Sequence, residues 1–280
     1  MTESALPFAP PPAWRAEAIA ARLAGERLGA RVIALEEVES TNDEVWARAR
    51  SGEREGLVVV AERQSKGRGR GGNAWFSPPY VGVWASVLLR PMLAATRVPL
   101  LSLAAGLAAA RAAESVGAPV GLKWPNDLVA ADGSGKKAGG VLVESRQDEG
   151  RWTVVVGVGV NANSVEEDFP PALRGRATSL ARLAGKPVAR EDFLIALVRQ
   201  LDTAYALLEQ AGDAKLLDEW RQRAVMFGRP VRVRGGGAEI HGVARDLVED
   251  GSLLVRLDSG VELSVRAGEL EVLWQGGGGV

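Results

Sequence analysis

The sequence predicts an α/β (α+β) fold, in which a mixed β-sheet packed by helices is followed by a small all-β barrel. Up to Gly228, runs rich in β-branched residues alternate with longer helix-like stretches, a pattern typical of a sheet covered by helices. After Gly228, short strand-like runs are separated by glycine-containing turns at regular spacing, which favours a barrel. The predicted barrel strands are residues 231–233, 240–248, 253–257, 262–265 and 270–273.

Residues 1–28 are predicted to form an N-terminal lead and, over residues 13–28, a helix, and a strand follows at residues 31–37. Thr41 and Glu44 form a capping box, so a helix should begin there and run to about Arg50. Apolar, β-branched runs predict the remaining strands of the sheet. They are residues 57–61, 81–90, 120–123, 128–130, 141–145 and 151–160.

Three further helices are predicted. Residues 98–116 are rich in alanine and leucine and apolar on most sides, so this helix should be buried, with Gly117 at its C-terminal cap. Residues 190–211 carry apolar side chains along one face, which predicts an amphipathic helix, and residues 214–226 form a shorter one. The polar, proline-broken residues 164–179 are predicted to be a mobile loop.

Composition excludes several kinds of chemistry. The 280 residues contain no cysteine and one histidine, His241, which excludes thiolate nucleophiles, Ser-His-Asp triads and poly-histidine zinc sites. We expect no protein-held metal site and place His241 on the surface of a barrel strand. The net charge of -1 gives no overall field that would attract nucleic acid or an anionic membrane.

No targeting or membrane segment is recognisable in the sequence. Residues 1–12 carry an acid and four prolines but no cationic segment before an apolar run, so they are not a signal peptide. No stretch reaches the about 18 uncharged apolar residues that a membrane-spanning helix needs. We therefore expect a cytoplasmic protein with neither a membrane nor a nucleic acid as partner.

The stretch from residue 62 to residue 75 combines flexibility with positive charge. It reads E-R-Q-S-K-G-R-G-R-G-G-N-A-W, in which four glycines interleave with four cations. Glycine loses the most backbone freedom on folding, so such a loop is expected to be mobile until an anion orders it. Arginine suits carboxylate and phosphate groups. The alternative interpretation is a solvated basic hairpin tip.

Other glycine and cap patterns leave alternatives open. The G-x-G-x-x-G spacing of Gly67, Gly69 and Gly72 follows a strand, but the W-F-S-P-P segment at residues 75–79 cannot open the helix that a dinucleotide site requires. The S-T-N segment at residues 40–42 either offers a polar ligand the free groups of a helix N-terminus or only starts the helix. Alternating glycines in the strand at residues 151–160 indicate close approach of another group or tight packing against a helix.

Five short motifs occur in a specific order. They are S-T-N at residues 40–42, G-R-G-R-G-G-N-A-W at 67–75, K-W-P-N-D at 123–127, K-A-G-G-V-L-V-E at 137–144 and G-V-G-V-N at 157–161. Together they resemble the signature of the biotin–protein ligases, whose loop motif is G-R-G-R-x-G-x-x-W. One such motif would be weak evidence, whereas five in the family's order and spacing are specific. The resemblance runs from about Val32 to the C-terminus.

The resemblance implies an activity, a fold and partners. Biotin–protein ligases join biotin to ATP, giving biotinyl-5′-adenylate and pyrophosphate, and then transfer biotin to one lysine of a biotin carboxyl carrier protein, such as that of acetyl-CoA carboxylase. The implied fold is a catalytic domain of the class II synthetase/biotin ligase type at residues 29–228, followed by an SH3-like barrel at residues 229–280. The implied cofactors are ATP and Mg²⁺, and a homodimer is an open possibility.

The resemblance also implies roles for individual residues. Biotin contacts are implied for Ser40, Thr41, Asn42, Gln64, Gly67, Arg68, Gly69, Arg70, Lys137, Gly139 and Gly140. Contacts with ATP or the adenylate are implied for Arg70, Trp75, Lys123, Asn126 and Asn161. Catalytic roles are expected for Arg68, Arg70 and Lys137, whereas Asp127 either orients or deprotonates the acceptor lysine, or only belongs to a turn. The glycine-rich loop and residues 164–179 correspond to loops that order over ligand.

This chemistry suits a chain without cysteine or a catalytic histidine. Biotin's carboxylate is ionised at pH 7 and is itself the nucleophile, so the protein must supply positioning and positive charge. About forty residues precede Ser40, too few for the DNA-binding domain of some relatives, so we expect a monofunctional ligase. A lipoate–protein ligase or lipoyl/octanoyl transferase of related fold is the alternative enzyme. A nucleic-acid-binding protein is the alternative of another class, which the charge disfavours.

Overall fold

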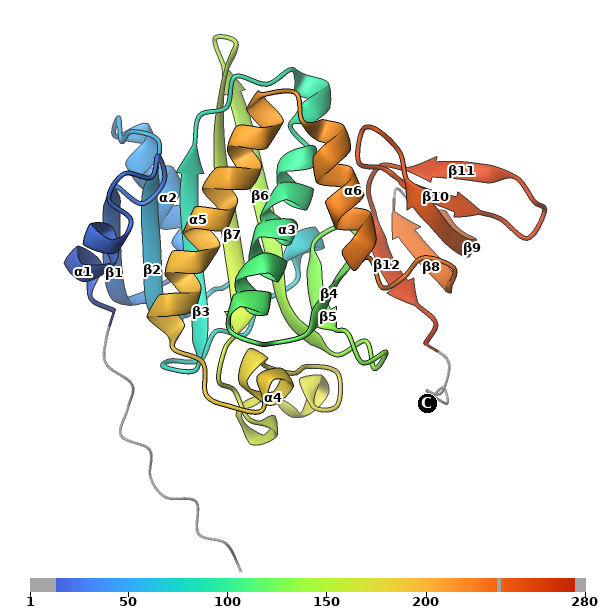
Figure 1. Cartoon of the computed structure of the whole chain (residues 1–280), viewed down its shortest axis with the longest axis horizontal. Helices are drawn as coiled ribbons and strands as arrows, with labels where there is room; N and C mark the ends of the chain where they lie inside the picture. The colour runs from blue at the N-terminus through green and yellow to red at the C-terminus, as the bar shows by residue number, and fades with distance from the viewer. Residues whose placement is uncertain (1–13, 236–237, 275–280) are drawn as a thin grey trace, which may run out of the picture.

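The computed structural model describes residues 14–235 and 238–274, so the predicted lead over residues 1–12 lies outside this range. Two sheets dominate these residues (Figure 1). The first has seven strands in the order β1-β2-β3-β7-β6-β5-β4, and the second has five in the order β11-β10-β9-β8-β12. Only β1 and β2 pair in parallel in the first sheet, which is therefore mixed, as predicted.

The strands follow the predicted positions closely. They are β1 (Arg31–Val38), β2 (Leu57–Gln64), β3 (Gly82–Leu89), β4 (Val120–Lys123), β5 (Asp127–Ala130), β6 (Lys137–Asp148), β7 (Arg151–Asn161), β8 (Pro230–Gly235), β9 (Ala238–Leu247), β10 (Leu253–Arg256), β11 (Glu262–Val265) and β12 (Glu269–Val272). The main difference is β6, which begins at Lys137 and not at residue 141. Gly139 and Gly140 pair with Val160 and Gly159 of β7, so this glycine pair extends the strand.

The helices are α1 (Ala16–Arg22), α2 (Thr41–Arg50), α3 (Leu100–Ser115), α4 (Leu180–Ala184), α5 (Arg190–Glu209) and α6 (Asp213–Arg223). The prediction of a helix over residues 13–28 was wrong in length, because α1 ends at Arg22 and Gly25 turns the chain with a φ of +96°. Residues 164–179 contain two short 3-10 turns and lead into α4, which was not predicted.

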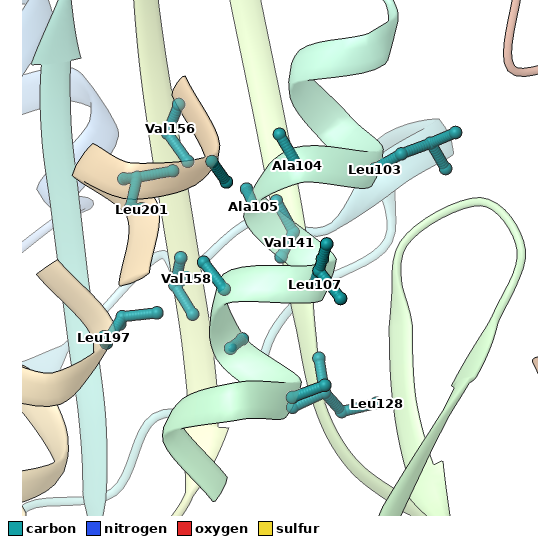
Figure 2. Close-up of a cluster of buried hydrophobic side chains, with 14 of the residues drawn as sticks. Leu103, Ala104, Ala105, Leu107, Leu128, Val141, Val156, Val158, Leu197 and Leu201 are labelled. Atoms are coloured by element: carbon teal, nitrogen blue, oxygen red, sulfur yellow. The ribbon is translucent and has the colours of Figure 1, made fainter. Parts of the chain in front are cut away.

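Helices cover both faces of the large sheet. Helices α3 and α5 pack on one face, where Leu107 of α3 and Leu201 of α5 meet Val156 and Val158 of β7 (Figure 2). As predicted, α3 is buried on most sides. Helix α2 covers the opposite face, where Val45 and Trp46 form a separate cluster with apolar side chains of β2, β3 and β7.

The two faces follow from alternation along the strands. In β2, Val58 and Val60 point into the core beneath α3 and α5, whereas Leu57 and Val59 point toward α2. Successive side chains of a strand lie on opposite faces, so a strand buried on both sides reads as a continuous apolar run. This is why the β2 sequence lacks a polar/apolar alternation.

The five-stranded sheet lies beside β4, β5 and α6 (Figure 1). Helix α6 contacts β9, and Arg221 of α6 pairs with Asp246 of β9 at 2.7 Å. His241 lies on β9 with an exposed side chain beside Glu239, as expected for a surface histidine. Within the described part of the chain, no helix is long and apolar enough to span a bilayer. The domain boundaries at residues 28 and 228 stay predictions.

Candidate functional site

The glycine-rich loop joins β2 to β3 and folds as a small hairpin. Arg68 bridges to Ala74, and the Trp75 amide donates to the Gly67 carbonyl at 2.8 Å. Gly71 and Gly72 turn the chain with φ values of +66° and +82°, which side-chain-bearing residues rarely adopt. The glycines therefore allow the tight turn that directly follows Arg68 and Arg70 and brings Arg68 opposite Ala74.

The S-T-N segment lies at the start of α2, and all three residues are buried. The predicted capping box is wrong: the N-cap is Ser40, and no side chain caps the helix. The Thr41 amide and hydroxyl instead donate to Gln64 Oε1 of β2 at 2.8 and 3.0 Å. Asn42 Nδ2 donates to Glu144 Oε2 of β6 at 2.8 Å. The Thr41 hydroxyl thus bonds to Gln64 of β2, and not to the backbone of its own helix as the local sequence suggested.

Ser40, Thr41, Asn42 and Gln64 form a polar wall. Two serines, Ser77 and Ser86, bond to it, and neither was predicted from the sequence. Ser86 Oγ lies 2.6 Å from Asn42 Oδ1 and 2.7 Å from Thr41 Oγ1, although Ser86 sits inside the apolar strand β3. Ser77 Oγ accepts a hydrogen bond from Gln64 Nε2 at 2.9 Å. A single hydroxyl in an otherwise apolar strand was the available signal for Ser86, because buried polar groups are normally hydrogen-bonded.

A cavity of about 360 Å³ lies between the loop and β6. Its lining residues are Arg68, Gly69, Arg70, Gly71, Gly72, Leu142 and Glu144. Arg68 Nη2 bonds to Asp43 Oδ1 at 2.8 Å and to Glu144 Oε2 at 3.1 Å. The same Glu144 oxygen accepts from Asn42, so the cavity and the polar wall share one carboxylate. Neither Asp43 nor Glu144 was among the predicted site residues.

Asp127 lies at the centre of a lysine pair. Its Oδ1 is 2.6 Å from Lys137 Nζ and its Oδ2 is 2.8 Å from Lys123 Nζ. Burial acts to raise the pKa of Asp127, but the two ammonium groups outweigh it and hold the pKa below its usual range. An ionised carboxylate with a lowered pKa is a weak base. The two predicted roles of Asp127, as an orienting group or as a base, stay predictions.

Arg70 is a half-buried cation next to this cluster. Burial lowers the pKa of the Arg70 guanidinium, and the through-space attraction of Asp127 only partly opposes the effect. Asp127 is already shared by Lys123 and Lys137. Its single negative charge thus faces three cations, which leaves a net positive centre suited to an anion such as carboxylate or phosphate.

The two glycines of β7 accept side chains against the backbone. A Cβ on Gly157 would lie 2.2 Å from Asn42 Oδ1, and a Cβ on Gly159 would lie 2.5 Å from Trp75 Nε1. Both predicted alternatives occur: Gly157 packs tightly against Asn42 of helix α2, and Gly159 is approached by Trp75 of the loop. The Trp75 Nε1 atom is buried without a hydrogen-bond partner among the described residues.

Trp75 connects the loop to the lysine pair. Lys137 Nζ lies 5.1 Å from the centroid of the Trp75 ring, within the range of a cation–π interaction. Gly140 leaves room for Lys137 and Asp127, since a Cβ there would lie 3.3 Å from Lys137 Cε and 3.5 Å from Asp127 Oδ1. Gly139 packs against the backbone of β7, where a Cβ would lie 2.9 Å from the Gly159 oxygen.

The two predicted asparagines have structural partners. Asn126 Nδ2 donates to the Val141 carbonyl at 2.6 Å, and Asn161 Nδ2 donates to the Thr178 carbonyl at 3.0 Å. Both side chains therefore fix neighbouring backbone in this structure, and their nucleotide contacts stay predictions. The second sheet also touches the site, since Lys123 Nζ donates to the Leu270 carbonyl at 3.2 Å. No sequence signal pointed to that contact.

Comparisons with known proteins agree with this arrangement. Residues 34–161 match the biotin/lipoate A/B protein ligase family, and residues 226–273 match the biotin protein ligase C-terminal domain. The "Biotin--[acetyl-CoA-carboxylase] ligase" of Mycobacterium tuberculosis is 35% identical over 242 residues, which cover 82% of this chain and 85% of that protein. The chain belongs to the biotin protein ligase family.

Other members are similar over comparable lengths. The "Bifunctional ligase/repressor BirA" of Bacillus subtilis is 31% identical over 239 residues, covering 85% of this chain and 73% of that protein. The solved structure of a biotin protein ligase from Aquifex aeolicus in complex with biotin and ATP superposes with a TM-score of 0.75 at 28% identity. It covers 87% of this chain and 99% of the Aquifex chain. The predicted fold, catalytic sheet followed by the family's C-terminal domain, is confirmed.

Proposed function

We propose that this chain is a biotin–protein ligase that activates biotin with ATP and transfers it to a lysine of an acetyl-CoA carboxylase carrier protein. The observation that carries the proposal is the net positive centre formed by Arg70, Lys123 and Lys137 around Asp127, next to a buried polar wall. The similarity to a biotin–[acetyl-CoA-carboxylase] ligase over most of both chains supports the same conclusion.

In the first step, a carboxylate oxygen of biotin attacks the α-phosphorus of ATP. The new bond is the acyl–phosphate bond of biotinyl-5′-adenylate, and pyrophosphate leaves with the electrons of the bond between the α- and β-phosphates. Two anions must approach each other, so positioning and cations dominate the catalysis. We assign this role to Arg68, Arg70 and Lys137, with Mg²⁺ accompanying the phosphates.

In the second step, the neutral Nζ of the acceptor lysine attacks the acyl carbon of the adenylate. An amide bond forms, AMP leaves with the electron pair, and the amine loses a proton to solvent or to the departing phosphate. Asp127 cannot readily take that proton, because its pKa is held low by two lysines. We assign it the role of fixing Lys123 and Lys137.

The two ligands are assigned to neighbouring parts of the site. We place biotin against the polar wall of Ser40, Thr41, Asn42 and Gln64, beneath Gly67 to Arg70 and beside Lys137, Gly139 and Gly140. The buried Thr41, Asn42 and Gln64 groups are held by hydrogen bonds, which suits them to orient a polar ring. We place the nucleotide near Trp75, Lys123, Asn126 and Asn161, with Arg70 between the two ligands.

The remaining expectations accompany this proposal. We propose a cytoplasmic enzyme divided at residues 28 and 228, without a nucleic-acid partner, and we leave a homodimer open. A lipoate–protein ligase is the alternative of related fold. The match of residues 226–273 to the biotin protein ligase C-terminal domain favours biotin.

The decisive experiment combines the protein with ATP, Mg²⁺ and either biotin or lipoate. We expect pyrophosphate release in the presence of biotin but not of lipoate. A carboxyl-carrier domain added to the biotin reaction should then gain the mass of one biotinyl group. The matched control is a carrier domain whose acceptor lysine is replaced by arginine, which should gain no mass. Pyrophosphate release with lipoate but not with biotin would overturn the proposal.

A further inference from the structure

Arg190, the first residue of α5, is a buried cation that the proposed reaction does not use. Only 6% of its surface is exposed. A positive charge is unfavourable at a helix N-terminus, where the helix dipole is itself positive, and burial adds a desolvation cost. Neither helix formation nor solvation explains an arginine in this place, so its partners must.

Those partners lie at the two stems of the glycine-rich loop. Arg190 Nη1 and Nη2 bond to the Glu62 carboxylate at 2.6 and 3.2 Å, and Glu62 lies near the end of β2. Nη1 also donates to the carbonyl of Gly82, the first residue of β3, at 3.3 Å. One guanidinium therefore links the strand that enters the loop to the strand that leaves it.

Trp14 covers this link from the N-terminal side. The Cζ atom of Arg190 lies 4.6 Å from the Trp14 ring centroid, and Trp14 is buried. The next residue, Arg15, pairs with Glu191 of α5 at 2.7 Å and also donates its backbone amide to that carboxylate. The ring thus shields the guanidinium from water, which strengthens its hydrogen bonds.

Both strand ends that carry the loop, at Glu62 and at Gly82, are connected to residues of the candidate site. Glu62 stands two residues before Gln64, whose side chain bonds to Thr41 and Ser77. Gly82 packs against Trp84, because a Cβ there would lie 2.0 Å from its ring. The Trp84 ring in turn meets Trp75 edge-on at 6.5 Å between centroids. A change in the spacing of the stems would therefore move both the polar wall and Trp75.

We propose that Arg190 is a positioning residue that fixes the base of the glycine-rich loop. By joining Glu62 to the Gly82 carbonyl, it holds the loop in register above the cavity. The inference rests on the proposed function only for its kinetic consequence, namely retention of the adenylate.

The first test is limited proteolysis with trypsin, followed by mass spectrometric mapping of the cut sites. The loop offers Arg63, Lys66, Arg68 and Arg70 as cleavage sites. The variant is the double substitution Glu62→Gln with Arg190→Met, which removes the link without leaving a buried charge unpaired. The matched control is Arg97→Met, which breaks the bonds of Arg97 to Asp213 and to the Leu208 carbonyl, contacts that involve no loop residue.

Cleavage in the loop should accelerate about tenfold in the double variant and stay within about twofold in the control, because proteolysis follows the population of the opened segment. The single variant Arg190→Lys keeps the charge but loses the planar geometry, so its cleavage rate should be intermediate. Unchanged loop cleavage, or an equal rise at all sites along the chain, would overturn the proposal.

The second test measures adenylate dissociation and the KM for biotin at a temperature where all variants are fully folded. We expect both to rise about tenfold in the double variant while the KM for the acceptor domain stays unchanged, since only the loop is displaced. If the adenylate dissociation rate and the KM for biotin were the same in the double variant and in Arg97→Met, Arg190 would not be a positioning residue for the loop. Absence of adenylate in the unsubstituted protein would refute the proposed function and leave the proteolysis decisive for Arg190.

Discussion

Replacing Asp127 with asparagine tests the charge balance of the site. The carboxylate holds Lys137 at 2.6 Å and Lys123 at 2.8 Å. Asparagine has nearly the same shape, but it retains only one acceptor oxygen and turns an N–H₂ donor toward the other ammonium. The substitution therefore removes the negative charge and one hydrogen bond while the packing of β5 is preserved.

The expected loss of stability follows from the hydrogen bonds of Asp127 to Lys123 and Lys137 and from the exposure of the two lysines. A hydrogen bond to a charged group contributes about 1.5 to 3 kcal/mol. The side chains of Lys123 and Lys137 are 21% and 37% exposed, so solvent recovers part of the loss. We expect a destabilisation of about 2 kcal/mol at pH 7, which corresponds to a Tm lower by about 4 to 8 °C in a protein of this size.

The assay is thermal unfolding of both proteins between pH 7 and pH 3. The folded-state pKa of Asp127 lies below its ordinary value of 3.8, so its stabilisation is complete above that value and is lost as pH falls through the folded-state pKa. The Tm difference between Asp127→Asn and the unsubstituted protein should thus be constant from pH 7 to about 5 and shrink below about pH 4.

Asp148→Asn is the matched control, because Asp148 is exposed at the tip of the β6–β7 hairpin. Its Tm should change by less than about 1 °C. A Tm of Asp127→Asn equal to that of the unsubstituted protein at pH 7 would refute the reasoning, as would a difference that persists undiminished at pH 3.

Three further substitutions probe the ligand positions. Lys137→Ala should slow biotin-dependent pyrophosphate release about 10²-fold, as for one lost electrostatic stabiliser, and a near-normal rate would argue against its role. Gly157→Ala would place a Cβ 2.2 Å from Asn42 Oδ1, so calorimetry should show biotin affinity about tenfold lower or worse. Arg68→Ala frees Glu144 from its 3.1 Å pair and should raise the adenylate dissociation rate about tenfold; an unchanged rate would remove Arg68 from the site.

Features encoded by short-range pattern were predictable from the sequence. The alanine- and leucine-rich run became the buried helix α3, and the β-branched runs became the central strands. The glycines Gly157 and Gly159 correctly indicated close approach, because only a missing side chain admits Asn42 and Trp75 there. The five motifs identified the family, since their order reflects a shared fold and not local propensity.

Features decided by distant partners were not predictable. Thr41 and Glu44 fit a capping box, yet the Thr41 hydroxyl bonds to Gln64, 23 residues away. Ser86 finds its partner 44 residues earlier in the chain, and Arg190 finds Glu62 128 residues earlier. Such pairings depend on how the strands and helices assemble, which no local window of sequence contains.

Two side chains of the K-W-P-N-D segment donate hydrogen bonds to main-chain carbonyls of the second sheet and its turns. Lys123 Nζ donates to the Leu270 carbonyl at 3.2 Å, and Trp124 Nε1 donates to the Gly251 carbonyl at 3.0 Å. Leu270 lies on β12 and Gly251 in the turn between β9 and β10, and a main-chain carbonyl is present whatever side chain its residue carries, so these contacts do not require particular side chains. They do not tolerate a rigid-body shift of about an ångström, because hydrogen bonds weaken steeply with distance and angle. The positions of the Lys123 and Trp124 side chains thus depend on where the second sheet lies more than on which side chains it carries.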